Sequence, residues 1–473
     1  MLRGKTSVAS HNILPAPFRI GLIAQKEIRG SLLNFKIPLA FVVLTALFVL
    51  SARLLAVDYH QRLENWKVNR AVLNNPPQAG TANYNLPDGA FAYSVSVFHD
   101  LPIQPPLPIS ALVKGVGSEM DRPVTAIEVI VFGARQTENN LFSLFGTPDV
   151  SLLTRLIVSL FCILFCVDSV TREKEGGTLQ ALLAQPVSRK DILMGKIVGA
   201  HVGIIAPFTF AYFSAVAYLW SKDALIGNRA DYLRVVLLFF LSLLYCMVFI
   251  FLGLFISTIV RRTKSAVAVA LLVWVALVLV LPNAAVLAAR LITPAPSYNQ
   301  FDARREQLRR EMILAEMRAH PEARSFFETP NAFEANVREL EMERQLTDDF
   351  IAGKLRQMDR AHNLAVIFPV GALGFGLSDV AGTGRSAYKS YMEFLKGGRD
   401  MVFDAFKRRH EMPGQEGARF RREVASAVES RLLEAEPLSK SLRSAAPSAL
   451  SLSTWMLLLA AMSSWRFQRY DVR

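Results

Sequence analysis

Six long apolar stretches constrain the fold of this chain more than any other feature. Each has roughly 17 to 26 residues, which as a helix matches a hydrocarbon core about 30 Å thick. A helix is expected because lipid offers no hydrogen-bond partner to the backbone. The sequence therefore predicts an all-α membrane protein with six transmembrane helices. These are residues 37–57, 152–170, 197–220, 235–260, 266–289 and 449–465.

The stretch before the first span predicts an amphipathic helix. It mixes bulky apolar residues (Phe18, Leu22, Ile28, Leu32) with polar ones (Arg19, Lys26, Glu27, Arg29). Such a helix next to a span suits the lipid headgroup region, so we expect residues 1–36 to form a cytoplasmic tail with an interfacial helix. A plain solvated helix is the alternative. We expect no cleavable signal, because the first apolar run is long enough to span the bilayer.

Lysine and arginine residues predict the orientation of the spans. They gather on one side of the membrane, before the first span, in the loops 171–196 and 261–265, and in the tail 466–473. The only short loop on the other side, 221–234, carries Lys222, Arg229 and Arg234. Because positive flanks stay in the cytoplasm, we expect both termini and the 171–196 loop to be cytoplasmic.

Two long insertions are then expected on the extracytoplasmic side, at 58–149 and 291–446. The first continues the helix of the first span and later alternates apolar and polar residues at 91–98 and 124–132, which predicts a mixed α/β element. A proline-rich stretch, 102–108, reads as an extended connection between those runs. The second is charge-laced in the manner of exposed helices, with both signs nearly balanced.

The stretch 363–384, inside the second insertion, is apolar but rich in glycine. We interpret it as a shallow re-entrant or interfacial helix. A seventh span is the alternative, but it would place the flanks of the last helix on the wrong side of the membrane.

Several function classes are disfavoured by what the sequence lacks. The net charge is +13, yet no basic stripe with interleaved aromatics appears, so no nucleic-acid partner is expected; the charge suits orientation and membrane lipid. There is no phosphate-binding loop, because Gly382-Thr-Gly-Arg-Ser lacks the spacing and the lysine. No catalytic or metal-binding motif is visible, and the three cysteines lie within apolar runs. We therefore expect no catalytic, cofactor or metal site, which weighs against a membrane enzyme or scaffold.

The loop 171–196 carries the most specific pattern in the chain. Gly176 and Gly177 permit a sharp entry to a small helix that begins at Thr178, and Pro186 ends it. Three leucines, Leu179, Leu182 and Leu183, share one face of that helix. A compact helix held at the membrane surface by two spans can receive a push from a soluble partner.

The order of residues in this loop resembles the permease subunits of ABC-2 type exporters. The matching positions are Glu173, Glu175, Gly177, Thr178, Leu179, Leu182, Leu183, Pro186, Ser188, Arg189, Gly195 and Lys196. The layout looks closest to the subset with two large extracytoplasmic insertions, which includes permeases similar to those of gliding motility and copper-enzyme maturation. Local similarity is weaker around 368–384.

The resemblance implies a force-receiving role for the loop. A separate ABC ATPase subunit would bind ATP and Mg, grip the helix with Leu179, Leu182 and Leu183 as anchors, and contact Glu173 and Glu175. Gly177, Thr178, Pro186 and Arg189 complete the implied coupling site. A second permease copy or a paralogue would complete the path, in the inner membrane of a bacterium. The alternative is a mechanotransmitter that relays ATPase motion to a periplasmic partner and moves no substrate.

Overall fold

The computed structural model describes residues 15–74, 105–115, 148–185, 187–225, 227–409 and 434–469, and this part of the chain is helical, without a strand. Six helices are long and apolar enough to cross a membrane. They are Lys36–Val68, Val150–Glu175, Arg189–Ser221, Arg229–Ile259, Thr263–Ile292 and Leu438–Gln468. The prediction of an all-α membrane protein with six spans is confirmed.

The elements follow the chain in a simple order. The first two spans and the loop after them comprise α1 (Ala16–Leu33), α2 (Lys36–Asn74), the 3₁₀ turn η1 (Pro108–Ala111), α7 (Val150–Leu153), the π-helical turn η2 (Thr154–Val158), α8 (Ser159–Cys166), α9 (Thr171–Glu175) and α10 (Thr178–Leu183). The third to fifth spans comprise α11 (Arg189–Ser221), α12 (Arg229–Ile259), α13 (Thr263–Val275), the π-helical turn η3 (Ala276–Val280) and α14 (Leu281–Ile292). The rest comprises α15 (Tyr298–Ala319), η4 (Phe326–Glu328), α16 (Ala332–Ala365), α17 (Pro369–Ala381), α18 (Arg385–Arg409) and α20 (Leu438–Gln468).

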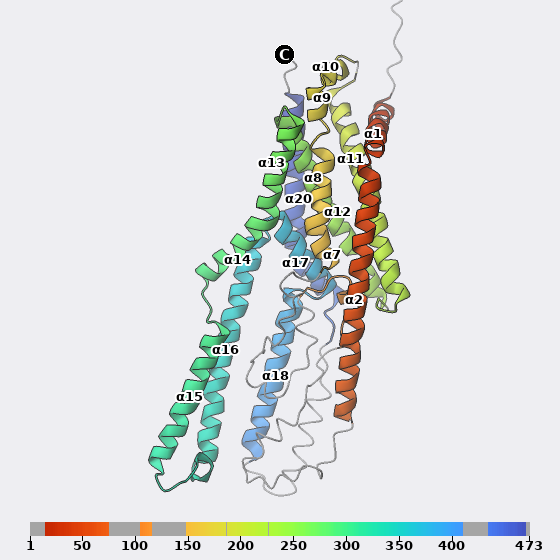
Figure 1. Ribbon diagram of the computed structural model, residues 1–473. Helices are drawn as coiled ribbons and strands as arrows, with labels where there is room; N and C mark the ends of the chain where they lie inside the picture. Colours follow the sequence, from red (N-terminus) through yellow and green to blue (C-terminus); the bar gives the residue numbers. More distant parts are fainter. Residues whose placement is uncertain are drawn as a thin grey trace, which may run out of the picture.

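The helices form one elongated bundle with two different ends. Figure 1 shows α1, α9, α10 and the C-terminal end of α20 together at one end, while α15, α16 and α18 project from the opposite end. The helical character expected of the second insertion is thereby confirmed for its described residues. The predicted strand runs 91–98 and 124–132 lie outside the described residues, as does Pro186.

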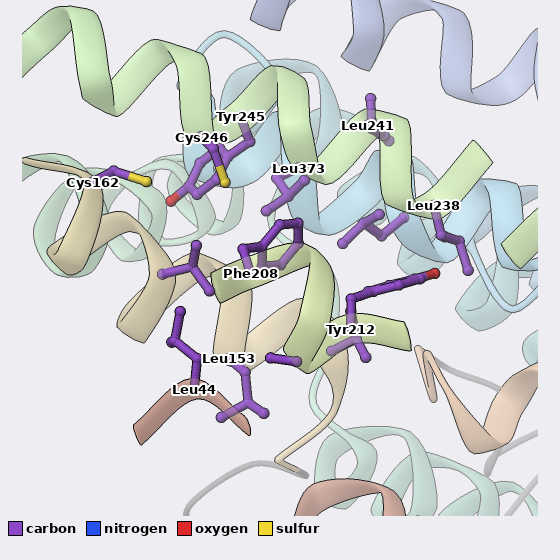
Figure 2. Close-up of a cluster of buried hydrophobic side chains, with 14 of the residues drawn as sticks. Leu44, Leu153, Cys162, Phe208, Tyr212, Leu238, Leu241, Tyr245, Cys246 and Leu373 are labelled. Carbon is purple, nitrogen blue, oxygen red and sulfur yellow. The ribbon is translucent and has the colours of Figure 1, made fainter. Parts of the chain in front are cut away.

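The core of the bundle is built from large side chains of several spans. Leu44 of α2, Phe208 and Tyr212 of α11 and Tyr245 of α12 are all buried and belong to one cluster (Figure 2). Lipid is as apolar as these side chains, so the hydrophobic effect contributes little to helix association in the membrane. Close packing of the side chains stabilises the bundle through dispersion contacts instead. The three cysteines, which the sequence placed within apolar runs, are free thiols buried in this bundle.

Helix α17 answers the question left open for residues 363–384. It has 13 residues, and at 1.5 Å per residue it is about 20 Å long, too short to cross the hydrocarbon core. It starts with Pro369 at its first position and ends at Gly382, whose φ of +71° lies in the left-handed region. The helix packs against α12 and α20. This length favours the non-spanning interpretation over a seventh span, and the placement of α17 in the membrane stays a prediction.

The helices are longer than the apolar runs that predicted them, most clearly the first and the last. The first, expected to end at 57, continues as α2 to Asn74, and the last, expected at 449–465, belongs to a helix that runs from Leu438 to Gln468. Pro447 lies inside that last helix without ending it. Apolar runs mark where lipid begins and ends, whereas a helix can continue into the headgroup region and beyond.

Candidate functional site

The loop between the second and third spans folds into two short helices, α9 and α10. Gly177 joins them with a φ of +69°, a left-handed conformation in which a side chain would be strained. The sharp entry predicted from Gly176 and Gly177 is therefore present. It turns α10 away from the direction of the second span, so that the loop forms a compact cap on one end of the bundle.

Helix α9 is fastened to the corner between α12 and α13. The Lys174 ammonium donates hydrogen bonds to the carbonyl oxygens of Ser257, Thr258 and Val260, at 3.0, 2.7 and 3.2 Å. These carbonyls lie at the C-terminus of α12, where helix geometry leaves the backbone without partners and favours a cation.

Glu175 extends this fastening to the fifth span. Its carboxylate accepts a hydrogen bond from the backbone N–H of Thr263, the first residue of α13, at 3.1 Å. A carboxylate at a helix N-terminus satisfies a free donor and interacts favourably with the helix dipole. Glu175 is thus an exposed residue with a structural partner, and the α9–α13 contact joins the second and fifth spans.

A buried Glu–Lys cluster (Lys26, Glu27, Glu173 and Lys196) links α1, α9 and α11. The Lys196 ammonium is 1% exposed and lies 3.0 Å from Glu173 and 2.7 Å from Glu27. Lys26 completes the cluster at 3.2 Å from Glu173. The Lys26 side chain is 63% exposed, so the buried part of the cluster is one ammonium, that of Lys196, between two carboxylates. The sequence pointed to Glu173 and Lys196 but not to the two residues of α1.

Glycines on α11 allow α1 to approach this cluster. A Cβ added to Gly195 would lie 2.6 Å from the Cβ of Ile23, and one added to Gly199 would lie 2.7 Å from the Cβ of Glu27. Helix backbones that come this close need glycine at the contact. The predicted interfacial helix is therefore packed directly against the start of the third span.

The leucine face of α10 points into the bundle. Leu179 is 2% exposed, and it packs in a cluster to which half-buried Leu182 and Leu183 also belong. The other members of that cluster are Val170, Ile192, Leu193, Leu254 and Phe467. The three leucines expected to anchor a partner thus contact the chain's own helices. The outward side of the loop carries Thr178, Gln180, Ala181, Ala184 and Gln185, all exposed.

The remaining loop residues fix the start of α11. Ser188 caps that helix by accepting the N–H of Asp191 at 3.0 Å. The Arg189 guanidinium donates to the carbonyl of Gln468 at 2.8 Å, at the C-terminus of α20. The site residues thereby join the loop to the last span as well.

Asp168 shows how the end of the second span is neutralised. Its carboxylate pairs with the Lys36 ammonium of α2 at 2.8 Å. This ion pair gives Asp168 a structural partner at the end of the second span. In the described part of the chain, no group of three or more His, Cys, Asp or Glu side chains could hold a metal ion.

Comparison with known proteins agrees with this architecture. No protein among the curated ones matches the chain. A family model described as "ABC-2 family transporter protein" matches residues 22–472, nearly the whole length. Together with six helices that can cross a membrane, this identifies a multi-pass membrane protein. The chain belongs to the ABC-2 family of transporter proteins.

Proposed function

We propose that this chain is the permease subunit of an exporter, driven by a separate ATPase that docks on α9 and α10. Membership of the ABC-2 family implies an ABC ATPase partner in general. The observation that carries the proposal is the attachment of this loop to the surrounding helices. Lys174 and Glu175 bond α9 to the corner of α12 and α13, and Leu179 packs α10 against α11, α12 and α20. A push on the loop is therefore delivered to several spans at once.

The docking contact is assigned to the outward side of α10. The exposed side chains there are small or polar, so a partner can approach the backbone of α10 closely. They are Thr178, Gln180, Ala181 and Ala184. The leucines act behind this surface, because they hold α10 rigidly on the bundle and transmit its displacement. Glu173 and Glu175 serve the same end through their ion pair and hydrogen bond rather than as contacts for the partner.

The same proposal assigns the other parts of the transporter. ATP and Mg would bind to the ATPase, and a second permease copy or a paralogue would complete the path.

The second candidate function, a mechanotransmitter acting on a periplasmic partner, is favoured by the projecting helices. Helix α16 has 34 residues, which corresponds to about 50 Å, and lies outside the six candidate spans.

Large side chains on the outward face of α10 are expected to break the coupling. In the Ala181→Arg/Ala184→Arg variant, two long cations replace exposed methyl groups, so the fold is retained while a closely fitting partner is excluded. We expect at least a tenfold loss of co-purification with the co-expressed ABC ATPase, and loss of any permease-dependent ATP hydrolysis. Ala303→Arg, on an exposed position of α15, is the matched control and is expected to bind normally.

Unchanged assembly of the Ala181→Arg/Ala184→Arg variant would rule out docking on α10. The leucines are less suitable targets, because a carboxylate placed at Leu182 or Leu183 would disturb a packed cluster of the chain itself. Loss of binding in such a variant would report misfolding as readily as a lost contact.

The proposed orientation predicts which engineered thiols face the cytoplasm. Gln180→Cys and Asn331→Cys each place a thiol at an exposed position, on α10 and just before α16. A membrane-impermeant maleimide applied to intact spheroplasts should label Asn331→Cys and should label Gln180→Cys only after permeabilisation. The natural cysteines are buried, so the background is low. The reverse pattern would contradict a cytoplasmic α10.

A further inference from the structure

A loop segment, residues 105–115, is buried in the end of the bundle opposite to α10. Connections between helices normally run over the protein surface, because their backbone polar groups need partners. Here Ile109, Ala111, Leu112 and Val113 are each no more than 1% exposed. The segment contains the 3₁₀ turn η1, which packs against α2 and α12. Such burial of a loop calls for contacts that replace water.

On one side, α2 supplies those contacts. The Arg62 guanidinium donates to the hydroxyl of Ser110 at 3.1 Å, and the Lys114 ammonium pairs with Asp58 at 3.0 Å. Arg62 also pairs with Asp58 at 2.9 Å. The extension of the first span thus binds the segment through Asp58 and Arg62.

On the opposite side, the segment is bonded to the start of the second span. The backbone N–H of Val150 donates to the carbonyl of Leu112 at 3.2 Å. The buried carboxylate of Asp149 accepts the N–H of Lys114 at 3.1 Å while capping α7 through the N–H of Leu152 at 2.8 Å. The first turn of the second span and the segment therefore share one acceptor.

A third contact comes from the end of α17. The Thr383 hydroxyl lies 3.3 Å from the carbonyl oxygen of Val113 and donates to it. Gly115 follows with a φ of +52°, and a Cβ there would lie 2.5 Å from the Thr383 hydroxyl oxygen. The chain can pass this close to α17 only because residue 115 is glycine. The segment is thus held between α2, α7 and α17.

The second span connects this segment to α9 and α10. The span Val150–Glu175 is about 39 Å long at 1.5 Å per residue, and it begins at the Leu112 contact and ends with α9. Near its start it contains η2, a π-helical turn, a feature frequent at functional sites. Motion of α9 along or across the bundle is therefore carried to the bonds that hold the segment.

From these contacts we infer that residues 108–115 form an outer plug, which closes the extracytoplasmic end of the path and is released when the second span moves. This inference rests on the proposed function. Its apolar turn packs in the core and seals the end of the bundle. Beside that packing, two hydrogen bonds join it to the start of the second span, and a shift of that span would break them. The occupant of the opened end is the exported substrate.

The plug is tested by the reactivity of a thiol placed inside it. Leu112→Cys puts a small thiol at a position that is 1% exposed, and Val113→Cys is a second variant should the first fail to fold. The full chain, with its ABC ATPase, is treated in nanodiscs with a polar maleimide. We expect little labelling without nucleotide and at least tenfold faster labelling during ATP turnover. Leu238→Cys, buried on α12 outside the plug, should stay unreactive throughout.

The outcomes separate the plug from the proposed function. If the ATPase binds and hydrolyses ATP while Leu112→Cys stays unreactive, the plug is a fixed part of the fold and the inference fails alone. Equal labelling with and without nucleotide would overturn it in the same way. If no ABC ATPase binds the chain, the proposed function is wrong, and the plug inference, which rests on it, is wrong as well.

Discussion

Replacement of Lys196 by methionine is expected to destabilise the junction of α1, α9 and α11 by about 3–5 kcal/mol. The change leaves the carboxylates of Glu27 and Glu173 buried without the cation that lies 2.7 Å and 3.0 Å from them. Removal of one partner from a buried ion pair costs this much because the remaining charge is neither hydrated nor neutralised. Lys26 compensates little, since its side chain is 63% exposed and its charge is screened by water.

Denaturation of the detergent-purified protein, followed by tryptophan fluorescence, measures this loss. Lys190→Met is the matched control, because Lys190 lies on the same helix and is exposed; its effect should stay within about 0.5 kcal/mol. Adding Glu27→Gln and Glu173→Gln to the Lys196→Met variant should recover part of the stability, since no unpaired charge then remains. Equal stability of the Lys196→Met and Lys190→Met variants would show that the Glu–Lys cluster does not hold the junction.

Replacement of Asp379 by asparagine is expected to act in the opposite direction and to stabilise the protein at neutral pH. Asp379, on α17, is fully buried, and neither carboxylate oxygen has a hydrogen-bond partner of good geometry among the described residues; the backbone N–H of Arg385 favours the carboxylate only weakly. Burial raises the pKa of Asp379 from 3.8 to about 6, with the positive charge of Arg385 opposing the shift and the carboxylate of Glu436 adding to it.

The sign of the pH dependence follows from this raised pKa. Between pH 3.8 and about 6 the folded state binds the proton more tightly than the unfolded state, so stability falls as the pH rises through that window. A pKa difference of about two units between the folded and unfolded states corresponds to about 3 kcal/mol of stability, which the wild-type protein has lost above pH 6. Asp379→Asn removes the charge, so we expect a gain of up to about 3 kcal/mol at pH 7.5 and a flatter profile between pH 4 and 7.

Asp149 offers a matched comparison for this prediction. It is also a buried carboxyl whose pKa is raised by burial, but its two oxygens accept the N–H groups of Leu152 and Lys114. An amide can accept only one of these bonds and turns a donor toward the other, so Asp149→Asn should cost about 1–3 kcal/mol. Denaturation midpoints from pH 4 to 8 compare the two variants. A loss of stability in both would contradict the interpretation of Asp379.

Much of this fold could be predicted from the sequence because its spans are set by length and hydropathy alone. Each of the six apolar runs coincides with one of the six candidate spans, although several of the helices extend beyond their runs, by eleven residues at the end of the first and at the start of the last. Gly177 and the leucine spacing predicted α10, and the resemblance of the loop 171–196 to ABC-2 permeases is confirmed at the level of the family over residues 22–472. These features are local, or nearly so, and local sequence determines them.

The partners of these elements could not be predicted. The amphipathic pattern predicts that Leu179 packs against an apolar surface. It does not show whether that surface belongs to a partner or, as in the structure, to other helices of the same chain. Lys196 lies 169 residues from Glu27, and a charge pattern carries no information over such a distance. The proline-rich stretch before η1 resembled a surface connection, while the burial of Leu112 depends on three helices brought together by the fold. Long-range contacts of this kind arise only from the assembled bundle.

The inward-facing leucines of α10 have a practical consequence. Because Leu179 is buried and Leu182 and Leu183 are half-buried, α10 presents no fully exposed leucine, and the chain should remain soluble in detergent as a solitary subunit. If an ATPase docks on α10 as proposed, its recognition rests on a few small exposed residues, which can be exchanged without changing the interior. Under that proposal, substitutions on this one short helix would change which ATPase the chain accepts.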